Sequence, residues 1–225
     1  MLFKVTVLGL LAAIPLSLAA AVPSTLTPGT FEALPNNATK DMGILAAPKK
    51  YSGPWQNFPA IDTWLGTFDA LFEKNKNSMR STGSTADDVG RINVAIREAA
   101  KLGVDERVIL GIIMQESHGY VGVQTTYSPG EGIPTAGLMQ CSNCPGFPGR
   151  TGLSQNDITS MVVGGTQHYK ANLQNWGDKW SPESIYPALR EYNSGSVNTN
   201  DLSDGRGATP NYVSDIAQRL QGWVD

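Results

Sequence analysis

Hydrophobic residues recur at three- and four-residue intervals along most of the chain after residue 54, which is the spacing of one buried helix face. Stretches with this spacing cover residues 58–72, 85–103, 105–119, 154–173, 181–192 and 209–223. Residues 120–150 carry many Gly, Pro, Thr and Ser residues instead, which indicates loops with room for a small hairpin. No alternating pattern is long enough for a sheet-based core, so we expect a mainly α fold.

Residues typical of helix ends bound several of these stretches. Thr85 begins a sequence with the spacing of a capping box, and Asp105 is placed to cap the helix that follows it. Ser181 followed by Pro182 predicts another helix start, because Pro is favoured at the first helical position. Pro187, inside that same stretch, predicts a kink or a later start.

The first 53 residues differ from the rest of the chain. Residues 1–21 combine a Lys, an apolar run and a small-residue end, which is the pattern of a secretory signal peptide. Residues 22–53 are rich in Pro, Thr, Ala and Asn, and we expect a linker or propeptide with a glycosylation sequon at Asn37. Lys49-Lys50 is a candidate dibasic processing site, although a solvated lysine pair fits at least as well. The folded domain is then expected over residues 54–225.

Charge and length narrow the class of protein. The chain of 225 residues has a formal net charge of −3 and 40% hydrophobic residues, enough for one substantial core. No run of Lys or Arg indicates nucleic-acid binding, and nothing after the signal peptide is long and apolar enough to span a membrane. We therefore expect a secreted, extracellular monomer with one folded domain.

Two cysteines, Cys141 and Cys144, have the spacing C-x-x-C. This spacing occurs in redox motifs of cytosolic proteins and, when doubled, in zinc sites. Here it occurs once, and only His118 and His168 are available as further ligands. A local disulfide that shapes the loop is the better interpretation in a secreted chain, and no metal site is predicted.

Glu116 lies near the end of the stretch 105–119, on its apolar side. It follows Ile112 by four residues and Ile113 by three, so it continues the stripe that they form. A carboxylate in this position loses water, which raises its pKa and prepares it to act as a general acid near neutral pH. The alternative is a helix-end glutamate that turns back to solvent, and position alone favours that alternative.

Three sequence blocks favour the catalytic interpretation of Glu116. They are QESHG at 115–119, GLMQ at 137–140 and ALREYNSG at 188–195. In this order and spacing they resemble the lysozyme-like transglycosylase family, which includes soluble lytic transglycosylases and goose-type lysozymes. The segments around Gly165 and Tyr169 and from Tyr212 to Asp215 extend the resemblance, which covers residues 87–223. It implies a lysozyme-like fold with a small loop or β-hairpin insert after the catalytic helix.

The resemblance assigns Glu116 the role of general acid toward the glycosidic oxygen between N-acetylmuramic acid and N-acetylglucosamine. It also implies a glycan-binding groove formed by Ser117, Met139, Gln140, Tyr169, Tyr192 and Asn193. Amide and phenol side chains can bind sugar hydroxyls and N-acetyl groups, although a Ser at a helix end is also typical of a local cap. No cofactor is implied, because acid catalysis of this bond needs none.

A second carboxylate decides between two products. An inverting hydrolase needs a base roughly 6.5–9.5 Å from the acid to activate water. The resemblance implies that lytic transglycosylases instead use the substrate's own groups and release a 1,6-anhydro sugar. Glu131 lies in the loop where goose-type enzymes carry an Asp, so it is a candidate catalytic base. A solvated loop glutamate fits equally well, and both products stay open.

Together these features predict a secreted glycosidase that cleaves the β-1,4 bonds of peptidoglycan by hydrolysis or lytic transglycosylation. Chitin cleavage on the same fold is one alternative, because chitin shares the N-acetylglucosamine unit. A non-catalytic glycan-binding protein is another, although the retention of Glu116 argues against it.

Overall fold

The computed structural model describes residues 49–128 and 132–225. Its regular elements are the short 3-10 turns η1 (Trp55–Asn57) and η2 (Ile61–Thr63), the helices α1 (Phe68–Ser81), α2 (Ala86–Ala100), α3 (Glu106–Ser117), α4 (Gln155–Asn175), α5 (Pro182–Ser194) and α6 (Tyr212–Leu220), and the strands β1 (Thr126–Tyr127), β2 (Pro134–Ala136) and β3 (Cys141–Ser142). The expected mainly α architecture, with a small β insert after the third helix, is confirmed.

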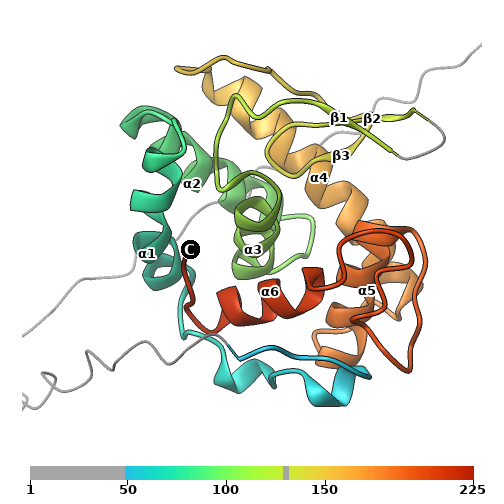
Figure 1. Ribbon diagram of the computed structural model, residues 1–225. Helices are drawn as coiled ribbons and strands as arrows, with labels where there is room; N and C mark the ends of the chain where they lie inside the picture. Colours follow the sequence, from blue (N-terminus) through green and yellow to red (C-terminus); the bar gives the residue numbers. More distant parts are fainter. Residues whose placement is uncertain (1–48, 129–131) are drawn as a thin grey trace, which may run out of the picture. The chain divides into compact units, whose positions relative to one another are not determined.

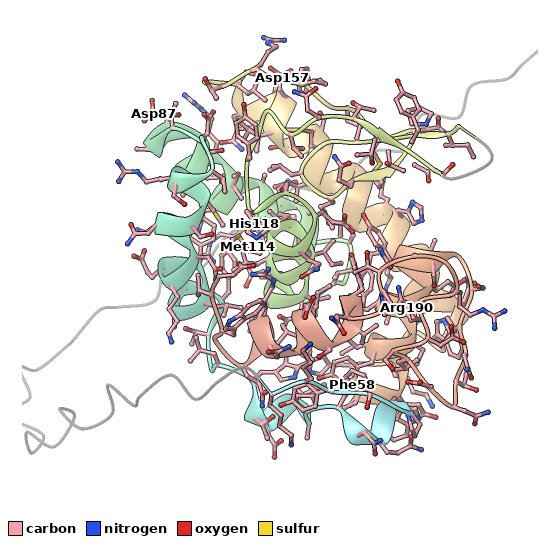
Figure 2. All side chains as sticks on the ribbon, viewed as in Figure 1. Phe58, Asp87, Met114, His118, Asp157 and Arg190 are labelled. Atoms are coloured by element: carbon pink, nitrogen blue, oxygen red, sulfur yellow. A yellow bond between two sulfur atoms is a disulfide. The ribbon has the colours of Figure 1, made fainter. Side chains whose placement is uncertain are left out.

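Helix α3 lies in the middle of the helical body and packs against α1, α2 and α6 (Figure 1). Asp105 caps it by accepting a hydrogen bond from the backbone N–H of Arg107, as the sequence predicts. Every residue from Val108 to Met114 is buried, and Figure 2 shows Met114 and His118 at the end of this helix. Because its whole middle section is enclosed, α3 is a firm support for the side chains of its last turn.

The small sheet follows α3 and is antiparallel in the order β1-β2-β3. Thr126 pairs with Thr135, and Ala136 pairs with Cys141. Cys141 and Cys144 form a disulfide with their Cα atoms 5.4 Å apart, so the predicted pairing is confirmed. The disulfide closes the turn that leaves β3.

The predicted helix over residues 58–72 is wrong in its position. Helix α1 begins only after Thr67, whose side chain accepts a hydrogen bond from the backbone N–H three residues later, and it continues through the polar stretch that we expected to end it. Pro59 cannot donate a backbone hydrogen bond and Gly66 disfavours helix, so the chain before α1 forms only 3-10 turns. Its aromatic residues still join the core, since Trp64 is only 4% exposed.

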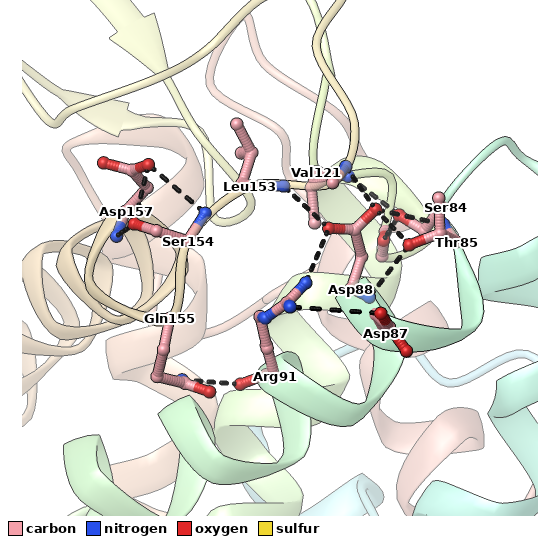
Figure 3. Close-up of polar contacts among 12 residues, drawn as sticks. Ser84, Thr85, Asp87, Asp88, Arg91, Val121, Leu153, Ser154, Gln155 and Asp157 are labelled. Carbon is pink, nitrogen blue, oxygen red and sulfur yellow. Dashed lines mark hydrogen bonds and ion pairs between the residues drawn. The ribbon is translucent and has the colours of Figure 1, made fainter.

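A buried carboxylate joins α2 to the loop before α4 (Figure 3). Asp88 is fully buried and accepts hydrogen bonds from the N–H and hydroxyl of Thr85 and from the backbone N–H groups of Gly152 and Leu153. Burial acts to raise the pKa of Asp88, but these hydrogen bonds outweigh it and hold the pKa below its usual value. The capping box predicted at Thr85 is confirmed, and it also anchors a distant loop.

Helix α5 begins at Pro182, as predicted, and contains Pro187 within its span. Of the two outcomes predicted for Pro187, the later start is wrong, and the kink stays a prediction. Pro187 is the sixth residue of the helix and lies past the first turn, because Ile185 already donates its N–H to the Ser181 carbonyl. Pro187 therefore removes one helical hydrogen bond, and the helix continues through it.

Within the residues that the structure describes, no helix is long and apolar enough to cross a bilayer. The predicted signal peptide, the sequon at Asn37 and the candidate base Glu131 lie outside the described residues. The end of the predicted linker is packed, because Tyr51 is buried and its backbone N–H donates to Oγ of Ser214 at 2.9 Å. The packed body therefore begins ahead of residue 54.

Candidate active site

Glu116 occupies the last turn of α3, directly after the buried residues Ile112 and Ile113. The helix ends because His118 and Gly119 adopt left-handed backbone conformations, with φ of 49° and 70°. The chain turns away toward the sheet, while the half-buried Glu116 side chain stays at the apolar end of the helix. This is the place that the hydrophobic stripe predicts for it.

Tyr212, the first residue of α6, donates a hydrogen bond from its hydroxyl to Oε1 of Glu116 at 2.7 Å. Burial raises the pKa of Glu116 to about 7, and the Tyr212 hydrogen bond acts in the opposite direction. Oε2 of Glu116 has no hydrogen-bond partner among the described residues. This oxygen is not fully enclosed by protein, so solvent can reach it. The carboxyl therefore has one oxygen held, one oxygen free, and a proton to give near neutral pH.

The segment 137–140 is fastened to the end of α3 by Ser117. The hydroxyl of Ser117 lies within hydrogen-bond distance of the carbonyl oxygens of Leu138, at 2.8 Å, and Ile113, at 3.0 Å. The Ser117 side chain is buried between the two segments. Ser117 therefore holds the segment 137–140 beside Glu116. Its contact with substrate stays a prediction.

Met139 packs closely against α4 at Gly165. A Cβ atom on Gly165 would lie only 2.4 Å from Cβ of Met139, so only glycine allows this approach. Thr166 contributes a hydroxyl 3.8 Å from the Met139 sulfur, and the Met139 carbonyl accepts a hydrogen bond from the hydroxyl of Tyr192 at 2.7 Å. Met139 is only 1% exposed. Its side chain contacts α4, and its carbonyl is hydrogen-bonded to α5.

Tyr192 is hydrogen-bonded to the segment 137–140 that lies beside the acid, and Tyr169 packs against Tyr192. Burial raises the pKa of Tyr192, and the negative charge of Glu116 raises it further, which indicates that the two groups are neighbours. The Tyr169 ring is 6.2 Å from that of Tyr192, and its hydroxyl donates to the carbonyl of Ile185 at 3.3 Å. The structure thus brings Tyr192 to the site and places Tyr169 as its buried support, without a hydrogen bond to Glu116.

Gln140 is hydrogen-bonded to strand β1, and Asn193 is hydrogen-bonded to the loop before α6. The side-chain oxygen of Gln140 accepts a hydrogen bond from the hydroxyl of Thr126 on β1 at 3.0 Å. The side-chain oxygen of Asn193 accepts one from the backbone N–H of Thr209 at 3.1 Å. Asn193 therefore fixes the chain just ahead of Tyr212, and a contact of either amide with substrate stays a prediction.

Among the described residues, burial and the Tyr212 hydrogen bond account for the pKa of Glu116, and no second carboxylate contributes to it. In the same part of the chain, no cluster of His, Cys, Asp and Glu side chains is arranged to hold a metal ion. Glu131, the candidate base, lies outside these residues.

Two residues were not predicted from the sequence as site residues, one bonded to the acid and one packed against Tyr192. Tyr212 belongs to the Tyr-Val-x-Asp segment that extends the family resemblance, so a signal existed, but its bond to an acid 96 residues away did not follow from it. His168 packs edge-on against Tyr192 with ring centroids 5.0 Å apart. Burial lowers the pKa of His168 and the charge of Glu191 opposes this, leaving the pKa below its usual value.

Comparison with protein-family models and with curated proteins finds no match for this chain.

Proposed function

We propose that this protein is a secreted glycosidase of lysozyme-like fold that cleaves the β-1,4 bond between N-acetylmuramic acid and N-acetylglucosamine in peptidoglycan. The observation that carries the proposal is the state of Glu116. Its carboxyl has a pKa of about 7, one oxygen held by Tyr212 and the other oxygen reachable from solvent. A general acid for glycosidic cleavage needs this combination.

The arrangement around the acid supports the same proposal. A three-stranded sheet follows the acid-bearing helix, and the segment 137–140 is held beside that helix by Ser117. Tyr192 from α5 and Tyr212 from α6 complete the surroundings of Glu116. These are the blocks that carry the resemblance to lytic transglycosylases and goose-type lysozymes, and they meet in space.

In the first step, Glu116 gives its proton from Oε2 to the glycosidic oxygen as the bond from that oxygen to C1 breaks. Positive charge develops on the sugar ring, and Glu116 becomes a carboxylate. The Tyr212 hydroxyl stabilises this carboxylate through its hydrogen bond to Oε1. When the nucleophile is the substrate's own 6-hydroxyl, the Glu116 carboxylate accepts its proton and returns to its starting state.

The nucleophile determines the product. If water attacks, a base such as Glu131 activates it and a reducing end forms. If the substrate's own 6-hydroxyl attacks, Glu116 alone suffices and a 1,6-anhydro end forms. The described residues support the acid step of both routes.

Secretion is part of the proposal. The signal-peptide pattern of residues 1–21 and the Cys141–Cys144 disulfide support it, because disulfides form and persist in oxidising compartments. An extracellular location also gives access to peptidoglycan.

Digestion of purified peptidoglycan and of chitin oligomers, followed by mass spectrometry of the new ends, tests the proposal. Wild type is expected to release fragments from peptidoglycan, and Glu116→Gln is expected to lose at least about 100-fold in rate, because an amide has no acidic proton. Anhydro ends would assign transglycosylation and reducing ends hydrolysis. If fragments are released from chitin and none from peptidoglycan, chitin is the substrate.

Glu106→Gln is the matched control, since Glu106 lies in the first turn of the same helix and its one ion pair within the described residues is with Arg97. It is expected to keep wild-type activity.

The Glu116→Gln variant must remain folded for the activity test to be valid, and its free energy of unfolding shows whether it does. Between about pH 4.5 and 7 the folded state of wild type binds a proton that the unfolded state releases, so its stability falls as pH rises. Above pH 7, Glu116→Gln should therefore be more stable than wild type by up to about 3 kcal/mol. Full activity of Glu116→Gln would refute the proposed mechanism.

A further inference from the structure

A pocket lies apart from Glu116, between η1, the end of α4 and α5. Figure 1 shows the chain around η1 passing along α5, against which η1 packs. The pocket has a volume of about 610 Å³, within the roughly 300–1,000 Å³ of pockets that hold small ligands. Its lining includes Trp55, Gln56, Asn175, Trp176, Glu183 and Asn200. None of these residues belongs to the Glu116 site.

The two indoles are the main apolar surfaces of this pocket. Trp55 and Trp176 both pack against the hydrophobic core on one side and stay partly exposed on the other. They come from segments far apart in the sequence, so the pocket exists only in the folded body. Tryptophan gives a large flat face at small loss of conformational freedom, which suits it to bind the flat face of another ring.

One wall of the pocket is held in place before any ligand binds. The carboxylate of Glu191 accepts hydrogen bonds from Nε1 of Trp176 at 2.6 Å and from Nδ2 of Asn175 at 2.9 Å. Both partners line the pocket. Glu191 therefore fixes the indole and leaves its face, together with the amide oxygen of Asn175, for a ligand. A preorganised wall lowers the loss of freedom that binding requires.

The polar side chains that line the pocket indicate a neutral ligand rich in hydroxyl and amide groups. Gln56, Asn175, Thr199 and Asn200 offer both donors and acceptors. The lining includes no Lys, Arg or His, and its one charged side chain is Glu183, so phosphate and carboxylate ligands are disfavoured. Sugar rings present apolar C–H faces to indoles and hydroxyls to amides, and N-acetyl groups add one more donor and acceptor.

We infer that this pocket, with Trp55 and Trp176 as its platform, is a second binding site for N-acetylated glycans, which holds the polymer while Glu116 acts on it elsewhere. The choice of glycan rests on the proposed function, but binding at the pocket requires no cleavage. The site therefore raises the affinity for a long or insoluble polymer, which contacts both sites, and leaves the cleavage of short soluble oligosaccharides unchanged.

Sedimentation with insoluble peptidoglycan and, separately, with chitin tests this inference, in the uncleaving Glu116→Gln background. Trp55→Ala is expected to weaken binding roughly tenfold, because the loss of an aromatic contact of this kind is of that order. Trp180→Ala is the matched control, since Trp180 is a tryptophan with 50% exposure that does not line the pocket. A Gln56→Ala/Asn200→Ala double variant, which changes only exposed residues, covers the case in which Trp55→Ala unfolds.

Fluorotryptophan labelling locates the ligand directly, because the chain has only five tryptophans. Addition of an N-acetylglucosamine tetrasaccharide should shift the fluorine resonances of Trp55 and Trp176 and leave that of Trp180 in place. Unchanged resonances, or equal polymer binding by wild type and the folded pocket variants, would overturn the inference. If the pocket binds glycan and no cleavage occurs on either polymer, the proposed function fails while this site stands.

Discussion

At the scale of single residues, the pair Tyr212 and Glu116 sets the pH at which the acid works. Because the Tyr212 hydrogen bond lowers the pKa of Glu116 against the effect of burial, Tyr212→Phe should raise that pKa above about 7. A general acid acts only while protonated, so the fall of kcat/KM at alkaline pH should move to higher pH in Tyr212→Phe. The pH dependence of peptidoglycan cleavage measures this shift.

Tyr127→Phe is the control for that measurement, because Tyr127 lies on the exposed side of β1 with 66% exposure. It should reproduce the wild-type profile. An alkaline limb that stays in place in Tyr212→Phe, or moves to lower pH, would mean that this hydrogen bond does not tune the acid.

The same pair shows what the sequence can predict about a site. The place of Glu116 on the apolar face was predictable, because local spacing from Ile112 and Ile113 fixes which residues share a helix face. Its catalytic interpretation comes from the three sequence blocks, since position alone favours a solvent-facing glutamate. The Tyr212 contact spans 96 residues and depends on how α6 docks against α3, which no local pattern contains. The contact of Asn193 was not predictable for the same reason. Its side-chain oxygen accepts a hydrogen bond from the backbone N–H of Thr209, which lies outside the sequence block that contains Asn193.

At the scale of elements, the approach of the segment 137–140 to α4 depends on Gly165. In Gly165→Ala the new Cβ would lie 2.4 Å from Cβ of Met139 and 2.6 Å from its sulfur, so one element must shift. Overpacking of this kind costs about 1–3 kcal/mol, which exceeds the gain in helix propensity from Gly to Ala. Urea unfolding should show lower stability, and cleavage should fall because the displaced segment lies beside Glu116.

Gly90→Ala gives the opposite expectation within the same fold. Nothing lies within 4 Å of a Cβ at Gly90 in α2, so the substitution should stabilise the protein by about 0.5–1 kcal/mol and leave cleavage unchanged. Equal effects of the two substitutions would show that Met139 does not pack on Gly165 as described.

Helix caps were predictable where the whole signal is local, as at Thr85 and Asp105, whose side chains accept hydrogen bonds from the first turn of the helix that each precedes. The position of α1 was not. Its apolar stripe continues backward through Phe58 and Trp64, and these residues are buried through tertiary packing without being helical. Hydrophobic spacing reports burial, and burial alone does not distinguish a helix from a packed irregular segment.

At the scale of the whole molecule, the chain before α1 is bound to the last helix. The backbone N–H of Tyr51 donates to Oγ of Ser214, and its hydroxyl donates to the side-chain oxygen of Gln221 at 2.5 Å. Farther along, the N–H of Leu65 donates to the carbonyl of Leu220 at 2.8 Å. Sequence composition indicated a linker up to residue 53. It could not reveal that Tyr51 is packed, because the partners of Tyr51 lie more than 160 positions farther along the chain. The active site thus depends on a segment that carries none of its residues.

Tyr51→Ala tests that dependence. Tyr51 is 8% exposed and its ring packs 5.8 Å from that of Phe58, so its truncation should lower the free energy of unfolding by about 3 kcal/mol. Amide hydrogen exchange should rise most at the C-terminal end of α6, because the substitution removes the hydroxyl bond to Gln221 and keeps the backbone bond to Ser214. Tyr127→Ala, at an exposed tyrosine of β1, should change neither quantity. Exchange that rises equally in all helices of Tyr51→Ala would indicate a general loss of stability and no special link between the segment and α6.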